Sequence, residues 1–107
     1  MRFLLPAALA VALMIGSAEA AKVIIGLGTA SCGTWTADRR NPEGLAARLK
    51  SQWILGFLSG VAAAEEFDPM QGVDANAVRA WMDDYCRAHP LELIMTAGEA
   101  FIREHPR

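Results

Sequence analysis

The chain has 107 residues, with 10 lysines and arginines against 12 aspartates and glutamates and a formal net charge of −2 at pH 7. A chain of this length builds one small domain. Because it has no basic excess to hold a phosphate backbone, we expect no nucleic-acid partner.

Residues 1–20 have the pattern of a secretory signal peptide. Arg2 provides a positive start, residues 3–15 form an apolar run without charge, and residues 18–20 read Ala-Glu-Ala, a small-x-small cleavage site. The apolar run is too short to span a bilayer. We therefore expect a signal peptide over 1–20, a mature domain over 21–107 without a membrane span, and a periplasmic or secreted location.

The two cysteines, Cys32 and Cys86, are expected to form one structural disulfide. Exported proteins enter an oxidising compartment in which such pairs usually bond. The bond would close a loop of about 55 residues, for which the chain-entropy model gives about 4 kcal/mol of stabilisation. A domain this small has a low free energy of unfolding, so we expect the disulfide to be required for folding.

The first part of the mature chain, residues 21–31, has no helical period. It is compatible with a short strand or with a loosely ordered arm. Gly26 and Gly28 suggest the start of a dinucleotide-binding fingerprint, but Ser31 stands where the third glycine belongs and no βαβ unit follows. We therefore expect no bound nucleotide.

A short helix is predicted from Cys32, and a long helix follows it. Asn41 as N-cap and Pro42 at the first helical position predict where the long helix begins, and its pattern continues to about Glu66. Its apolar and small residues fall at steps of three and four. This spacing predicts one core-facing side made of Leu45, Leu49, Trp53, Gly56, Phe57, Gly60 and Ala64.

Within that side, Gly56 and Gly60 form a strip of small residues where another helix can approach closely. Such strips also mediate the dimerisation of membrane helices. The apolar run over 53–64 is too short to cross a bilayer, so core packing is the preferred interpretation.

Two further helices are predicted in the C-terminal half. Residues 68–72 are rich in turn formers, and Asp74 is a good N-cap for a helix over 75–88 with a buried stripe of Val78, Trp81, Met82, Tyr85 and Cys86. Pro90 ends that helix and can open another that runs to about Arg103, with an inward face of Leu91, Ile94, Ala97, Gly98 and Phe101. The predicted fold is an all-α, single-domain bundle of four or five short helices with one disulfide.

No constellation of residues predicts catalysis or a metal site. The only 2 histidines, His89 and His105, lack the convergent ligands that a metal needs. The carboxylates over 65–68 and 83–84 lack the spacing of a calcium loop and are interpreted as solvated faces. We therefore expect no enzyme, no cofactor and no metal.

A protein partner is the function class that remains. Trp35, Trp53 and Trp81 are many tryptophans for so small a domain, and tryptophan is enriched at the hot spots of interfaces. Core packing explains most of them, but one exposed tryptophan would mark a binding patch. The candidate protein-binding or core face consists of Trp53, Gly56, Phe57, Gly60, Trp81 and Tyr85.

Three segments carry a family resemblance. They are Ser31-Cys32-Gly33-x-Trp35, residues 53–60 (Trp-Ile-Leu-Gly-Phe-Leu-Ser-Gly) and residues 81–91, which contain Tyr-Cys-x-x-His-Pro-Leu. Together they resemble the HdeA/HdeB-like family of small exported bacterial proteins, which share a signal peptide, one long-range disulfide and a small helical fold. The resemblance covers nearly all of the mature chain. It implies that the two cysteines match the family's cystine pair. It implies no catalytic residue, because the family has none.

The resemblance also implies a function. Characterised members are periplasmic chaperones that loosen at low pH and hold acid-unfolded clients, so we expect an acid-responsive holdase whose charge becomes strongly positive in acid. Tai-type immunity proteins have a similar size, export signal and helical character. An immunity or inhibitor protein that binds one dedicated periplasmic toxin or enzyme is therefore the alternative, and a homodimer is compatible with both.

Overall fold

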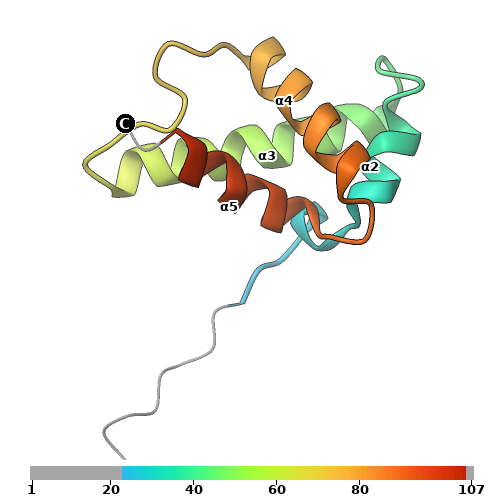
Figure 1. Cartoon of the computed structure of the whole chain (residues 1–107), viewed down its shortest axis with the longest axis horizontal. Helices are drawn as coiled ribbons and strands as arrows, with labels where there is room; N and C mark the ends of the chain where they lie inside the picture. Colours follow the sequence, from blue (N-terminus) through green and yellow to red (C-terminus); the bar gives the residue numbers. More distant parts are fainter. Residues whose placement is uncertain (1–22, 106–107) are drawn as a thin grey trace, which may run out of the picture.

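The computed structural model describes residues 23–105, which fold into helices joined by short connections (Figure 1). In chain order these are the 3-10 turn η2 (Leu27–Thr29) and the helices α2 (Cys32–Asp38), α3 (Leu45–Ala64), α4 (Ala75–Ala88) and α5 (Ile94–Glu104). Within this range there is no strand, only an isolated antiparallel bridge between Ser31 and Leu93. The all-α prediction is confirmed. The predicted signal peptide lies outside the described residues.

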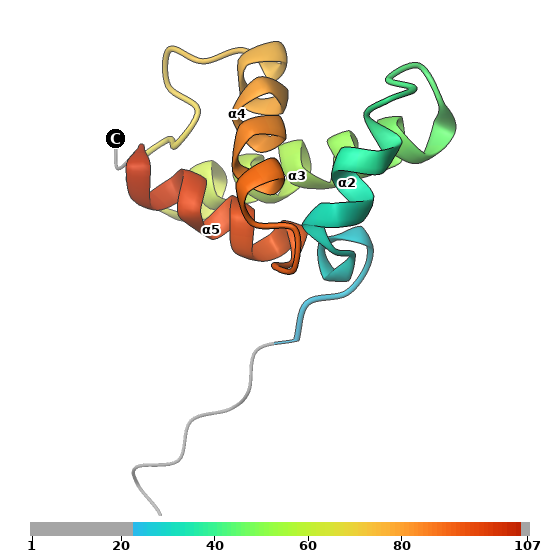
Figure 2. The same cartoon turned by 45° about the vertical axis from the view of Figure 1, so that its right-hand side comes forward.

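Helix α3 extends along the length of the domain, and α5 runs beside it (Figures 1 and 2). Helix α2 packs against α4 and α3, and α5 contacts both α3 and α4. The turn η2 packs against α3 and α5. Helices far apart in the chain are therefore in direct contact, with α3 as their common support.

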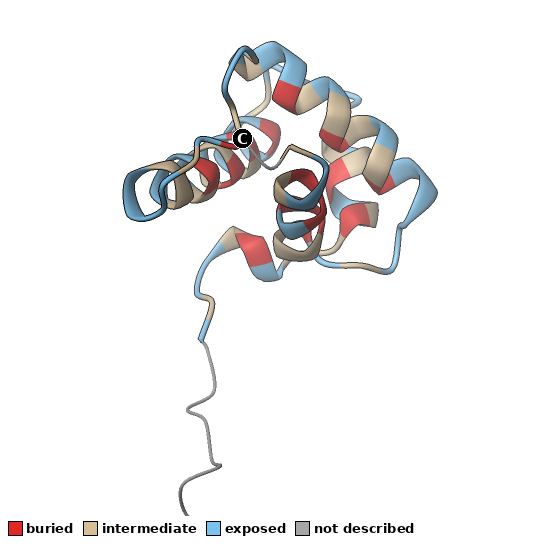
Figure 3. Cartoon of the chain, turned by 60° about the vertical axis from the view of Figure 1, so that its left-hand side comes forward, coloured by how far each residue is buried: buried red, intermediate tan, exposed pale blue. Residues whose placement is uncertain are grey.

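The core lies where α2, α4 and α5 meet α3. Trp35 from α2, Ile54 and Leu58 from α3, Met82 from α4 and Phe101 from α5 are each at most 1% exposed. Figure 3 shows buried positions gathered on the inward sides of the helices. Full burial of one such side chain contributes about 1.5–3 kcal/mol, so this cluster holds the fold together.

Two helices begin at side-chain caps. The hydroxyl of Ser31 accepts a hydrogen bond from the amide of Thr34 at 3.1 Å, and a carboxylate oxygen of Asp74 accepts one from the amide of Ala77 at 2.8 Å. Each cap satisfies an amide that has no partner within its own helix. The predicted helix over 75–88 and its Asp74 cap are confirmed.

The predicted start of the long helix at Asn41 and Pro42 is wrong. Helix α3 begins at Leu45, with Gly44 as its N-cap. The chain must first turn between α2 and α3, and the amide of Gly44 closes that turn by donating to the carbonyl of Asn41 at 2.9 Å. The end of α3 at Ala64 lies close to the predicted one.

The last helix begins at Ile94 and not at Pro90, and Leu91 is 94% exposed rather than inward. The residues before it form a turn, in which the amide of Glu92 donates to the carbonyl of His89 at 3.1 Å, and Leu93 then pairs with Ser31 at the start of α2. The amide of Cys32 donates to the carbonyl of Glu92 at 2.7 Å, and the amide of Ile94 donates to the carbonyl of Ala30 at 2.9 Å. These backbone hydrogen bonds hold the segment outside the helix.

The predicted core-facing side of α3 is correct only for Trp53 and Phe57, which are half-buried and pack against the core. The other residues of that predicted side are exposed. The buried residues of this helix are Ala47, Ser51, Ile54 and Leu58. Leu45 is 69% exposed and Leu49 is 48% exposed. Because α3 carries apolar residues on more than one side, periodicity alone does not identify the side that α4 and α5 cover.

The close approach of another helix does not use the glycines of α3 either. A Cβ added at Gly56 or Gly60 would meet no atom within 4 Å. Helix α5 contributes the contact instead, because a Cβ at Gly98 would come within 2.8 Å of the Ile54 Cδ1 atom and 3.0 Å of the Phe57 ring. The small residue needed for close packing is therefore Gly98.

Candidate functional site

The disulfide joins the start of α2 to the last turn of α4. Cys32 and Cys86 are fully buried, their Cα atoms are 4.6 Å apart, and 54 positions separate them in sequence. The predicted cystine is therefore present in the structure. It fixes the position of α4 relative to α2.

A carboxylate reinforces the same contact. Asp83 on α4 accepts a hydrogen bond from the Trp35 indole Nε1 at 2.8 Å, and its two oxygens accept from the Arg39 Nε and Nη2 atoms at 2.9 and 3.1 Å. This ion pair raises the pKa of Arg39, so its guanidinium stays charged. Asp83 was predicted to lie with Asp84 on a solvated face. Only Asp84 lies there, with 80% of its side chain exposed.

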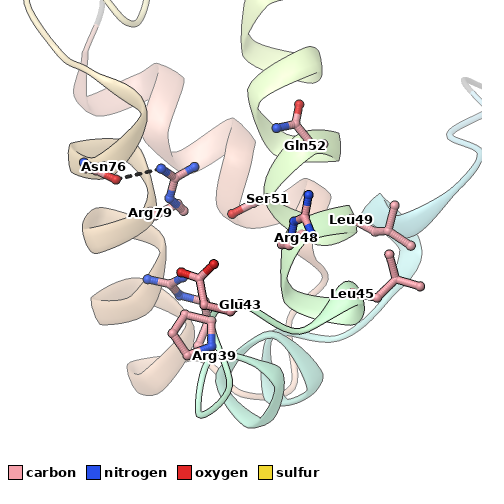
Figure 4. A pocket seen from close by; sticks show the side chains of 10 residues that line it. Arg39, Glu43, Leu45, Arg48, Leu49, Ser51, Gln52, Asn76 and Arg79 are labelled. Carbon is pink, nitrogen blue, oxygen red and sulfur yellow. Dashed lines mark hydrogen bonds between the residues drawn. The ribbon is translucent and has the colours of Figure 1, made fainter.

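A groove with a volume of about 530 Å³ opens between α3, α4 and the loop that follows α2 (Figure 4). Arg48 and Gln52 line it from α3, and Asn76 and Arg79 line it from α4. The disulfide and the Asp83 contacts hold the α4 wall against α2, and the buried residues Ile54 and Leu58 anchor the α3 wall in the core. The groove is therefore preformed.

The floor of the groove contains a buried hydroxyl without a partner. Ser51 is 5% exposed, and its Oγ atom has no hydrogen-bond partner among the described residues. Figure 4 shows this oxygen directed toward the space between α3 and α4. A buried hydroxyl without a hydrogen bond is costly, so a polar atom that reached this oxygen would satisfy it.

The charged side chains of the groove are mostly arginines. Arg39 is neutralised by Asp83. Arg79 Nη2 donates to the neutral Asn76 side chain at 2.7 Å. Glu43 is the carboxylate that lines the groove. None of these residues was predicted as a site, because they come from different helices. The one feature along the chain that could have indicated this site is a serine on the buried side of α3.

The residues predicted as a binding or core face lie in separate groups. Trp53 and Phe57 stack with ring centroids 5.3 Å apart, and the Trp53 Nε1 donates to the carbonyl of Ile25 at 3.3 Å. Trp81 and Tyr85 stack at 5.1 Å on α4. All four side chains are half-buried. The structure therefore places two aromatic pairs on two helices, and neither pair lines the groove.

The histidines His89 and His105 are the C-terminal cap residues of α4 and α5. His89 Nδ1 lies 2.9 Å from the carbonyl oxygen of Tyr85, and His105 Nδ1 lies 2.8 Å from that of Phe101, so each Nδ1 acts as the donor. Their rings stack on the same two aromatic residues at 4.2 and 4.1 Å. Over residues 23–105, no group of three or more His, Cys, Asp or Glu side chains could hold a metal ion.

Among the described residues, Tyr85 is the second, after Arg39, whose pKa is shifted. The neighbouring Glu92 carboxylate, followed by partial burial, raises the pKa of its phenol above the ordinary value of 10.0. The phenol is therefore neutral at physiological pH and remains a hydrogen-bond donor.

Comparison of the chain with protein-family models, with curated proteins and with solved structures gives no match. In the part of the chain that the structure describes, no helix is both long enough and apolar enough to cross a membrane.

Proposed function

We propose that this protein is a non-enzymatic, exported protein-binding module that holds a segment of a partner protein in the groove between α3 and α4. The observation that carries the proposal is the groove itself. It is open, has a volume of about 530 Å³, and combines an unpartnered hydroxyl on its floor with exposed leucines on its rim. Such a surface suits a polypeptide, which offers both polar and apolar groups.

The fixed walls of the groove favour one dedicated partner that binds at neutral pH. The disulfide and the Asp83 contacts position α4, and the buried residues Ile54 and Leu58 anchor α3. A preformed surface loses little conformational freedom on binding and therefore binds more tightly. This favours an inhibitor or immunity protein.

The proposed location is the periplasm or the extracellular space. Residues 1–20 have the signal-peptide pattern. The cystine between Cys32 and Cys86 supports the same location, because disulfides persist in oxidising compartments.

Site-specific photo-crosslinking tests the proposal. A photoreactive residue at Gln52 lies in the groove, and one at Glu99 lies on the exposed side of α5. With a periplasmic extract at neutral pH, we expect the Gln52 probe to capture one partner in a stoichiometric complex and the Glu99 probe to capture none. The same products from both probes, or none from either, would contradict the proposal.

A second candidate function, the acid-responsive holdase, is supported by the way α2 is joined to α4. The Trp35 indole and the Arg39 guanidinium both bond one carboxylate, Asp83. Carboxylates protonate in strong acid, which would weaken this contact while the disulfide limits unfolding. The uncovered core could then bind unfolded clients.

Light scattering from an acid-labile client distinguishes the two functions. A holdase suppresses aggregation at about pH 3 and has little effect at pH 7. Unchanged scattering in acid would contradict the holdase and leave the dedicated partner as the proposed function.

A further inference from the structure

We infer that the groove between α3 and α4 binds an acidic, leucine-bearing segment of the partner, with a carboxylate held by Arg48, Arg79 and the hydroxyl of Ser51. This inference rests on the proposed function and names the chemistry of the segment that the module binds.

The first argument is the charge of the groove. Among the described residues, no carboxylate lies within 4.0 Å of the guanidinium of Arg48 or of Arg79, although Arg39 and Lys50 are both paired. The two unpaired arginines stand on opposite walls, one on α3 and the other on α4 (Figure 4). Arginine offers several donors in a plane that matches a carboxylate, so the groove is complementary to an acidic side chain.

The second argument is the unused donor of Ser51. A serine inside a helix commonly bonds the carbonyl four residues earlier, as Ser59 does with Leu55 at 2.7 Å. Ser51 makes no such bond, although it is 5% exposed and lines the groove. An acceptor between the two arginines would complete its hydrogen bonding. This observation is independent of the charges.

The third argument is the apolar rim. Leu45 and Leu49 stand one turn apart on α3 and are 69% and 48% exposed. Figure 4 shows them beyond Arg48, on the side away from α4. A segment with its carboxylate over Ser51 can therefore place a neighbouring leucine on this rim, and removing that apolar area from water favours binding.

The carboxylate of Glu43 adds one negative charge to the groove. Glu43 lines the same groove from the loop after α2 and forms no ion pair in the described structure. It opposes a second carboxylate by charge repulsion. Neutralising Glu43 should therefore strengthen the binding of an acidic segment.

The experiment uses a short fluorescent peptide with leucines beside glutamates and the oxidised domain at pH 7. Fluorescence anisotropy should show saturable binding that weakens as salt is added and is lost when glutamines replace the glutamates. Arg48→Ala and Arg79→Ala should each weaken the affinity roughly tenfold or more. Arg103→Ala removes the same charge from the exposed end of α5 and should leave the affinity unchanged.

Two further variants separate binding from folding. Ser51→Ala should weaken the affinity while its Tm stays the same or rises, because the hydroxyl has no partner in the free domain. Glu43→Gln should strengthen the affinity. Equal affinity for the glutamine peptide, or an equal loss in Arg103→Ala, would overturn the inference.

The outcomes also distinguish this inference from the proposed function. Capture of one partner by the Gln52 probe, without preference for the acidic peptide, would overturn the inference and leave the protein-binding function intact. Charge-specific peptide binding, with no partner captured at neutral pH, would support the inference and contradict the proposed function.

Discussion

The indole ring of Trp53 lies directly against the backbone of Gly28. A Cβ atom at Gly28 would overlap Cη2, Cζ2 and Cζ3 of that ring, and the Trp53 Nε1 donates to the carbonyl of Ile25 at 3.3 Å. Gly26, on the same segment, has φ 99°, a value that favours glycine. These two glycines therefore allow the N-terminal segment to pack on α3. This packing explains the Gly26 and Gly28 spacing, which resembles the start of a nucleotide-binding fingerprint.

The first prediction follows from this contact. Gly28→Ala should lower the free energy of unfolding by about 1–3 kcal/mol, because the rigid indole must move to admit the methyl group. Gly56→Ala is the control, since the added methyl meets no atom within 4 Å. It should raise stability by up to about 1 kcal/mol through helix propensity. Denaturant titration measures both, and equal effects would contradict the packing.

The second prediction concerns the disulfide. Intact mass of the oxidised protein should be two hydrogens below that of the reduced chain, and Cys86→Ser should lose about 4 kcal/mol of stability, because the bond closes a long loop. Differential scanning calorimetry of the oxidised protein and the variant provides the comparison. Free thiols in protein purified without reductant, or an unchanged melting temperature, would be incompatible with a stabilising cystine.

The third prediction compares two adjacent aspartates. Asp83→Ala leaves the buried Trp35 indole without its acceptor and should cost about 1.5–3 kcal/mol, as expected for hydrogen bonds to a charged group. Asp84→Ala removes an exposed ion pair with Arg87 and should change stability by about 0.5 kcal/mol or less. Urea denaturation measures both. Equal costs would show that the contact between α2 and α4 does not depend on Asp83.

The fourth prediction concerns Tyr85, the only tyrosine of the chain. Its tyrosinate absorbance should have a midpoint above 10.0, and Glu92→Gln should lower that midpoint toward the ordinary value. Because the folded pKa is raised, the stabilisation is present below the unfolded pKa and is lost as the pH rises through the folded pKa. Spectrophotometric titration of both proteins tests this. A midpoint that does not respond to Glu92→Gln would rule out the contact.

The local features of this protein can be read from its residues in chain order. Helix α4 begins and ends at the predicted residues because Asp74 caps it and an amphipathic stripe continues to Ala88. The two cysteines allowed only one pairing, and the structure contains it. Helix caps and turn formers act over short distances along the chain, so they can be recognised in the sequence. The pairing of two cysteines follows from their number alone.

The rotation of α3 about its axis, and the groove beside it, depend on how the helices pack. Apolar residues surround α3 on several sides, so its spacing was compatible with burying Leu45 and Leu49, but α4 and α5 cover Ile54 and Leu58 instead. That rotation leaves Arg48 and the rim leucines facing outward and Ser51 on the floor. Arg48 and Arg79 share the groove because the helices pack there. Their proximity depends on the relative positions of two helices, which no local pattern encodes.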